Sequence, residues 1–196
     1  MKDINLFKME GSVYLKKVRS KTDISLDDDC DGYLICKKSS FLTNFLLLEK
    51  EARRIVESLK GSGKKIGIVG GDDVFNRRVV ETLKVDYLVS PEGGFKKDGL
   101  KQRDSGINHV VAKIAKEKGI LIVVDFNSVS KLEGKEKALR IGRIIQNVKV
   151  CRKAGCGLKI GSFGFEKGEV FDEKERRAFG LSLGMSSVQS ADCVRF

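Results

Sequence analysis

Short apolar runs alternate with longer helical stretches from about residue 32 onward, and this alternation limits the folds that the chain can adopt. Strands are predicted at Tyr33–Cys36, Ile66–Val69, Tyr87–Val89, Ile120–Val124 and Leu158–Ile160. Helices are predicted at about 44–60, 73–83, 105–118, 134–154 and 173–183. Runs that are apolar throughout are typical of strands buried on both faces of a parallel sheet. The pattern therefore predicts an α/β fold, and it leaves open whether the sheet is doubly wound or closed into a barrel.

The first 31 residues do not follow this pattern. They hold six basic and seven acidic residues, so residues 32–196 carry a net charge of +12. One strand is expected at Asn5–Lys8, and the acidic run Asp27–Asp31 is expected to be a solvated loop. Because no linker, repeat or low-complexity tract is evident, we predict a single domain over residues 1–196 with an atypical segment at 1–31.

The charge of the chain points to a polyanionic partner. There are 38 Lys and Arg residues against 27 Asp and Glu, which gives a net charge of +11. Such a charge on one small domain favours nucleic acid or an anionic membrane surface as the partner. The alternative is a basic protein without such a partner.

Cysteine usage and hydropathy indicate the compartment. The five cysteines are an odd number, and the first residues lack the apolar core of a secretory leader. No apolar run approaches the ~20 residues of a membrane helix. We therefore expect a reduced, soluble, cytoplasmic protein with no membrane association.

Metal and nucleophile signatures are sparse. The only histidine, His109, excludes a metal site built on paired imidazoles, and it is expected on the surface of the predicted helix 105–118. Cys151 and Cys156 lack the further ligands that a zinc site needs, so core or surface thiols are the better interpretation.

Acidic residues near strand ends leave one enzymatic hypothesis open. Asp125 ends a predicted strand, which is where barrels and doubly wound sheets place functional groups. Together with Asp72, Asp73 and Glu92 it could form the carboxylate cluster of an autonomous Mg²⁺-dependent nuclease or phosphoesterase. Carboxylates at such positions also serve as loop hydrogen-bond acceptors.

Basic residues give the stronger signal. Between Lys135 and Lys159 the local charge is +7, and on this helix Arg140, Arg143 and Asn147 are expected to share a face opposite an apolar stripe of Ile141, Ile145 and Val148. A second basic cluster flanks the glycine-rich loop 93–99. With few aromatic residues for base stacking, phosphate contacts are favoured. The predicted RNA-binding residues are Lys96, Lys97, Lys101, Arg103, Arg140, Arg143, Lys149 and Lys153.

The residues at the start of the predicted helix 105–118 include candidates for its N-cap. Asp104 or Ser105 is expected to cap the helix by accepting a backbone N–H of its first turn. Arg103 then lies just outside the cap, with its guanidinium free for a phosphate or a carboxylate of a partner.

The segment 100–119, LKQRDSGINHVVAKIAKEKG, resembles the signature helix of the archaeal ribonuclease P protein component 3 family. The strand Ile120–Phe126, the basic helix 135–153, the segment Lys159–Ser162 and the segment Phe179–Ser186 agree with that family in order and spacing. The resemblance covers about residues 64–190.

The resemblance implies a compact TIM-barrel-like α/β fold of mostly parallel strands, related to metal-dependent phosphoesterases but without their metal ligands. At 196 residues, against ~250 for a typical TIM barrel, an incomplete or distorted barrel is expected. It also implies a non-catalytic subunit of ribonuclease P, the RNA-based endoribonuclease that removes 5′ leaders from precursor tRNA. The implied partners are the ribonuclease P RNA, which binds the catalytic Mg²⁺, protein component 2 in a paired heterotetramer, and other protein subunits. No cofactor is implied for this chain.

Overall fold

The computed structural model describes residues 2–25, 27–36, 45–94, 97–99 and 103–196. Seven parallel strands form one sheet, in which each strand pairs with the next one along the chain. They are β1 Ile4–Asn5, β2 Val13–Val18, β3 Gly32–Ile35, β4 Lys65–Val69, β5 Tyr87–Val89, β6 Leu121–Asp125 and β7 Leu158–Gly161. A doubly wound sheet would reverse its strand order, so the sequential order decides for a barrel.

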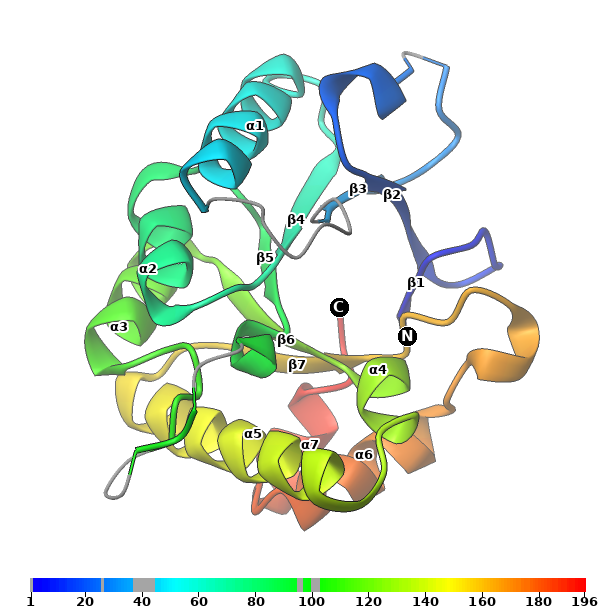
Figure 1. Cartoon of the computed structure of the whole chain (residues 1–196). Helices are drawn as coiled ribbons and strands as arrows, with labels where there is room; N and C mark the ends of the chain where they lie inside the picture. Colours follow the sequence, from blue (N-terminus) through cyan, green and yellow to red (C-terminus); the bar gives the residue numbers. More distant parts are fainter. Residues whose placement is uncertain (1, 26, 37–44, 95–96, 100–102) are drawn as a thin grey trace.

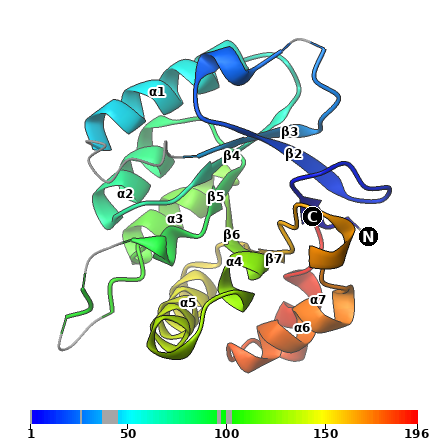
Figure 2. The ribbon, with the colours of Figure 1, turned by 45° about the vertical axis from the view of Figure 1, so that its right-hand side comes forward.

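Helices surround the strands, as Figure 1 shows. The rotated view in Figure 2 shows α1, α2, α3 and α5 following one another around the outside of the sheet. Among the described residues no helix is both long and apolar enough to cross a membrane. The helices are α1 Phe45–Ser58, α2 Asp73–Thr82, α3 His109–Lys118, α4 Phe126–Ser130, α5 Gly134–Ala154, α6 Glu173–Ser182 and α7 Ser187–Asp192.

The five strands predicted from continuous apolar runs are confirmed, each to within one residue. The strand prediction for residues 1–31 was wrong, because this segment holds two strands instead of one, and β1 ends at Asn5 where the predicted strand began. The segment Val13–Val18 was missed because Lys16 and Lys17 interrupt its apolar pattern. Lys16 pairs with Asp28 at 2.6 Å, so the acidic run 27–31 is tied to the sheet.

Two apolar layers explain why the strands are apolar throughout. Side chains on the inner face fill the barrel, among them Leu15, Leu34 and Val123. Side chains on the outer face, such as Ile68 and Ile122, pack against the helices. Each strand therefore buries both faces, as parallel strands of a barrel require.

The gap between β7 and β1 is narrowed by the two ends of the described chain. Phe163 N–H donates to Ile4 O at 2.8 Å, and Ile160 N–H donates to Cys193 O at 2.7 Å. A buried ion pair joins Arg176 to Asp3 at 3.0 Å across this seam. The result is a nearly closed seven-stranded barrel, and the expectation of an incomplete TIM-like barrel is confirmed.

Candidate nucleic-acid interface

The loop from β5 to α3 carries the signature segment and lies against α5. It begins with a short 3-10 helix, η2 Pro91–Gly93, which contacts α5. Asn76 of α2 holds the loop from the other side: its amide nitrogen donates to Pro91 O at 3.1 Å and to Gly106 O at 2.9 Å. Asn76 is fully buried, so its hydrogen bonds hold the described backbone at Pro91 and at Gly106.

Arg143 does not lie on an exposed face, contrary to the sequence prediction. Only 8% of the residue is exposed. Its Nε and one terminal nitrogen reach the Asp98 carboxylate at 2.8 and 2.7 Å, and the other terminal nitrogen donates to Gly94 O at 2.8 Å. Burial would raise the pKa of Asp98, but hydrogen bonds from Arg143 and from the Asp104 N–H hold it below its usual value. Arg143 therefore fixes the loop.

Asn147 is buried as well, so Arg140, Arg143 and Asn147 share a face of α5 as predicted, but the loop covers that face at two of the three residues. Its amide nitrogen donates to Ser105 O at 2.9 Å, while the neighbouring Gln146 donates to Arg103 O at 3.0 Å. The cause is geometric: α5 has the sheet on one side and the loop on another. The buried apolar residues of α5 are Ile144, Val148 and Cys151, whereas Ile141 and Ile145 are half-buried.

Arg140 is engaged by a buried carboxylate. One of its terminal nitrogens lies 3.6 Å from Oε1 of Glu92, which is completely buried. Burial raises the pKa of Glu92, and the Arg140 guanidinium opposes that rise. The Arg140 side chain remains 23% exposed, so it offers only part of its charge to a ligand.

Arg103 and Lys97 are exposed, as predicted. Both line a cleft of about 320 Å³ with Asp73, Asp104 and the residues that follow to the start of α3. The Arg103 guanidinium lies across α5, because a Cβ at Gly142 would stand 2.9 Å from its Nε and Cζ atoms. Lys96 and Lys101, also predicted to bind RNA, lie outside the described residues.

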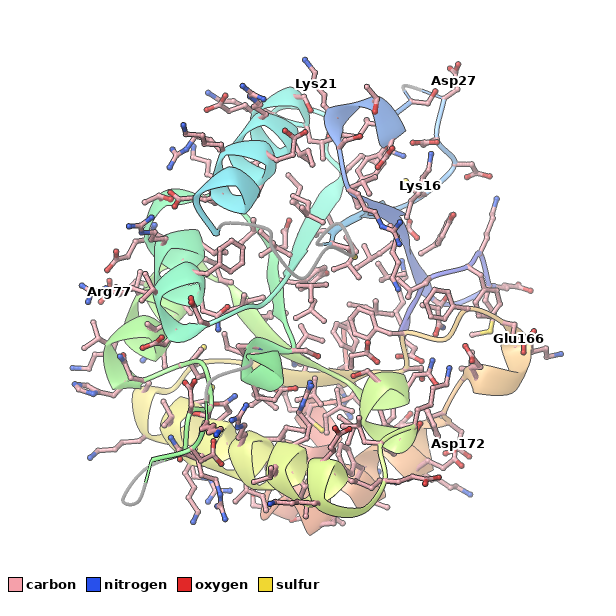
Figure 3. The ribbon with its side chains drawn as sticks, viewed as in Figure 1. Lys16, Lys21, Asp27, Arg77, Glu166 and Asp172 are labelled. Atoms are coloured by element: carbon pink, nitrogen blue, oxygen red, sulfur yellow. The ribbon has the colours of Figure 1, made fainter. Side chains whose placement is uncertain are left out.

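Lys149 and Lys153 lie in the last turns of α5, and both are exposed. Figure 3 shows that charged side chains of both signs cover the periphery, among them Arg77 and Asp172. Many basic residues there are paired; Arg77, for example, contacts Glu81 at 2.7 Å. By contrast, Lys97, Arg103, Lys149 and Lys153 have no ion pair with a carboxylate in the described part of the chain.

The acidic residues considered for a nuclease serve the fold. Asp72 caps α2 by accepting Phe75 N–H, and Asp125 caps α4 by accepting Ser128 N–H, each at 2.8 Å. Glu92 is paired with Arg140. Within the described ranges, no three His, Cys, Asp or Glu side chains are grouped so that they could hold a metal ion.

Comparisons with known proteins place this geometry in context. No family model matches the chain. Ribonuclease P protein component 3 of Methanocaldococcus jannaschii is 29% identical over 130 residues, covering 66% of this chain and 53% of that protein. The component 3 of Methanococcus vannielii is 24% identical over 161 residues, covering 80% and 65%. The chain is similar to ribonuclease P protein component 3. It spans about half to two thirds of the length of these two relatives.

Solved structures share the fold of this chain. A chain from the cryo-EM structure of archaeal ribonuclease P with mature tRNA matches 98% of it, with a TM-score of 0.65 and 22% identity; 86% of that chain is covered. An amidohydrolase matches 83% of it with a TM-score of 0.54 and 14% identity, and 40% of the amidohydrolase is covered. At these identities the matches establish a shared TIM-barrel-like architecture.

The start of α3 differs from the prediction. The helix begins at His109, and its cap is Asn108, whose side-chain oxygen accepts Val110 N–H and Val111 N–H, both at 3.0 Å. Gly106, with a φ of +77°, lies so close to Pro91 O that a Cβ would stand 1.9 Å away. The backbone cannot be helical there, which excludes Asp104 and Ser105 as the cap.

Replacing this cap gives a direct check. We expect Asn108→Ala to lower the free energy of unfolding by about 1 kcal/mol, because two N–H groups lose their acceptor. Asp104→Ala is the matched control, because the sequence suggested Asp104 as the cap and the structure shows that it does not cap α3. Urea unfolding of both variants measures the difference, and a larger loss in Asp104→Ala would contradict the observed cap.

The stability of the chain is expected to fall as the pH rises from 5 to 8. Burial raises the pKa of Asp125 from 3.8 to about 6, against opposing effects of the Ser128 N–H and the Lys17 charge. Since the unfolded chain loses this proton first, Asp125 alone lowers the free energy of unfolding by about 1 kcal/mol over this interval. Urea unfolding at pH 5 and pH 8 should show a smaller difference in the free energy of unfolding for Asp125→Asn than for the wild type. The asparagine cannot ionise, but it retains a side-chain oxygen that can cap α4. An equal difference would contradict the assignment.

Proposed function

We propose that this chain is a protein subunit of ribonuclease P, the RNA-based endoribonuclease that removes 5′ leaders from precursor tRNA. The observation that carries the proposal is a group of exposed basic residues that form no ion pair with a described carboxylate: Lys97 and Arg103 on the loop before α3, and Lys149 and Lys153 on α5. The similarity to curated component 3 proteins supports it. In this role the chain binds and stabilises the catalytic RNA and leaves the bond cleavage to it.

The side chains divide into two roles. Lys97, Arg103, Lys149 and Lys153 contact RNA phosphates, because they are exposed and form no ion pair with a carboxylate in the described ranges. Arg143 and Asn147 position the loop from beneath. Phosphate contacts are insensitive to sequence, so recognition depends on the shape of the RNA backbone.

The remaining parts of the assembly are proposed by analogy with the family. The RNA holds the catalytic Mg²⁺, and the chain itself needs no cofactor. Its protein partners are ribonuclease P protein component 2 and other protein subunits. The archaeal ribonuclease P structure that shares this fold was solved with tRNA, which fits a ribonucleoprotein assembly.

Salt dependence of RNA binding tests the phosphate contacts. For the full chain and a ribonuclease P RNA, we expect log Kd to change with log salt concentration at about 0.9 per phosphate neutralised in a duplex region. The double variant Lys97→Gln, Arg103→Gln should flatten that slope by up to about two units. Arg77→Gln is the matched control, because Arg77 is exposed on α2 and paired with Glu81.

A further variant perturbs Arg103 without removing it. In Gly142→Ala the new Cβ displaces the Arg103 guanidinium, so RNA affinity should fall while stability holds. An unchanged slope in the double variant would contradict the phosphate contacts. Cleavage of precursor tRNA by the chain alone, lost in Asp125→Ala, would instead identify an autonomous nuclease.

A further inference from the structure

Two cysteines are brought together by the way α5 ends. Gly155 terminates the helix in the left-handed conformation, with a φ of +68°. Its N–H donates to Arg152 O at 3.2 Å, and the next N–H, of Cys156, donates to Cys151 O at 2.9 Å. This pair of bonds is a Schellman motif, in which the side chains at the two outer positions commonly touch. Here those two side chains are Cys151 and Cys156.

The two thiols meet inside a cavity. The two thiols lie close enough for each to shift the pKa of the other. Both are buried, with 1% and 8% of the residue exposed, and both are free. They line a cavity of about 270 Å³ together with Met185 of the segment between α6 and α7. A cavity of this size allows a small solute to reach the two sulfur atoms, which are not exposed on the outer surface of the protein.

We propose that Cys151 and Cys156 form an oxidation site, at which a peroxide converts the two thiols into an intramolecular disulfide. The five-residue separation and the turn at Gly155 bring the two side chains to one side of the motif, where a disulfide can join them.

The order of reaction follows from the exposure of the two thiols. Cys156 is 8% exposed and Cys151 only 1%, so a peroxide reaches Cys156 first and Cys156 is the nucleophile. The neighbouring Cys151 also holds the pKa of Cys156 below its usual value. Its thiolate attacks one peroxide oxygen, the O–O bond breaks, and the product is a Cys156 sulfenic acid with the second oxygen leaving as water. The Cys151 sulfur then attacks the Cys156 sulfur and displaces hydroxide, which takes the Cys151 proton and leaves as water. Overall, two thiols lose two electrons and two protons to one peroxide.

Peptide mapping of the full chain tests this site. The reduced protein is treated with hydrogen peroxide, quenched with an alkylating reagent and digested without reductant. We expect a peptide linked through Cys151 and Cys156, about 2 Da lighter than the reduced form, to appear before any other cysteine is modified. Cys193→Ser is the matched control, because Cys193 is buried and free but lies outside this cavity lining, and it should leave the linkage intact.

Two further variants separate the roles of the two sulfurs. In Cys151→Ser the reaction should stop at a sulfenic acid on Cys156, which dimedone traps and mass spectrometry locates. In Cys156→Ser neither the linkage nor the trapped product should form at Cys151 on the same time scale. The proposal fails if wild-type protein is oxidised first at Cys36, or if Cys151 and Cys156 go to sulfinic acids without a linked peptide. The wild-type map alone decides this, whether or not a serine variant folds.

Discussion

Replacing Arg176 by methionine is expected to lower the free energy of unfolding by about 3–5 kcal/mol, because it leaves a buried carboxylate without its partner. Arg176 and Asp3 are 3.0 Å apart, and their side chains are only 6% and 8% exposed. The same guanidinium donates to Ile160 O at 3.1 Å and to Val194 O at 3.3 Å. One side chain thus joins β7, the N-terminal strand and the C-terminal segment where the barrel does not close.

Urea unfolding measures the loss, and the neighbouring residue supplies a control. Arg177 is exposed and reaches Glu173 only at 4.0 Å, so Arg177→Met should change stability by less than about 0.5 kcal/mol. Burial already raises the pKa of Asp3 despite Arg176, so the double variant Asp3→Asn, Arg176→Met should recover part of the loss. A loss below about 1 kcal/mol in Arg176→Met would show that the seam does not depend on this pair.

The strands could be predicted because a barrel leaves a strong pattern in its sequence. Residues such as Ile68 and Val123 are buried on opposite faces of the sheet, so whole runs are apolar. The strand Val13–Val18 escaped this rule, since one of its lysines is neutralised by Asp28 and another lies over the Phe165 ring at 4.0 Å. Pairs of this kind join residues that are far apart in the sequence, so the hydrophobic pattern of a short segment does not reveal them.

The candidate interface was predicted only in part, for a related reason. Periodicity along α5 distinguishes one apolar face from the rest, and it does not show that a loop 40 to 50 residues earlier covers a second face. Arg143 and Asn147 were therefore placed in solvent. Asn76 was missed altogether; an asparagine inside a helix that follows a Gly-Gly pair was the available signal. Exposure of Lys97 and Arg103 was predicted correctly because the glycine-rich loop keeps them away from any apolar stripe.

Arg143→Met is expected to lower the free energy of unfolding by about 3 kcal/mol and to weaken RNA binding indirectly. The change removes two hydrogen bonds to Asp98 and the bond to Gly94 O, so the loop that carries Lys97 and Arg103 loses its attachment to α5. Arg143→Lys keeps the charge, but an ammonium group does not present the two nitrogens with which the planar guanidinium contacts the Asp98 carboxylate. Most of the loss in the free energy of unfolding should therefore remain.

A double-mutant cycle with Asp98→Asn separates a positioning role from a phosphate contact. If Arg143 acts through the loop, the two changes are coupled by about 1–3 kcal/mol in unfolding, because each removes the same buried pair. If Arg143 instead contacted a phosphate, Arg143→Met would flatten the salt slope of RNA binding by about one unit. Its stability would then change by less than about 0.5 kcal/mol, because it would behave as an exposed residue. The paired hydrogen bonds from Arg143 to Asp98 lead us to expect the first outcome.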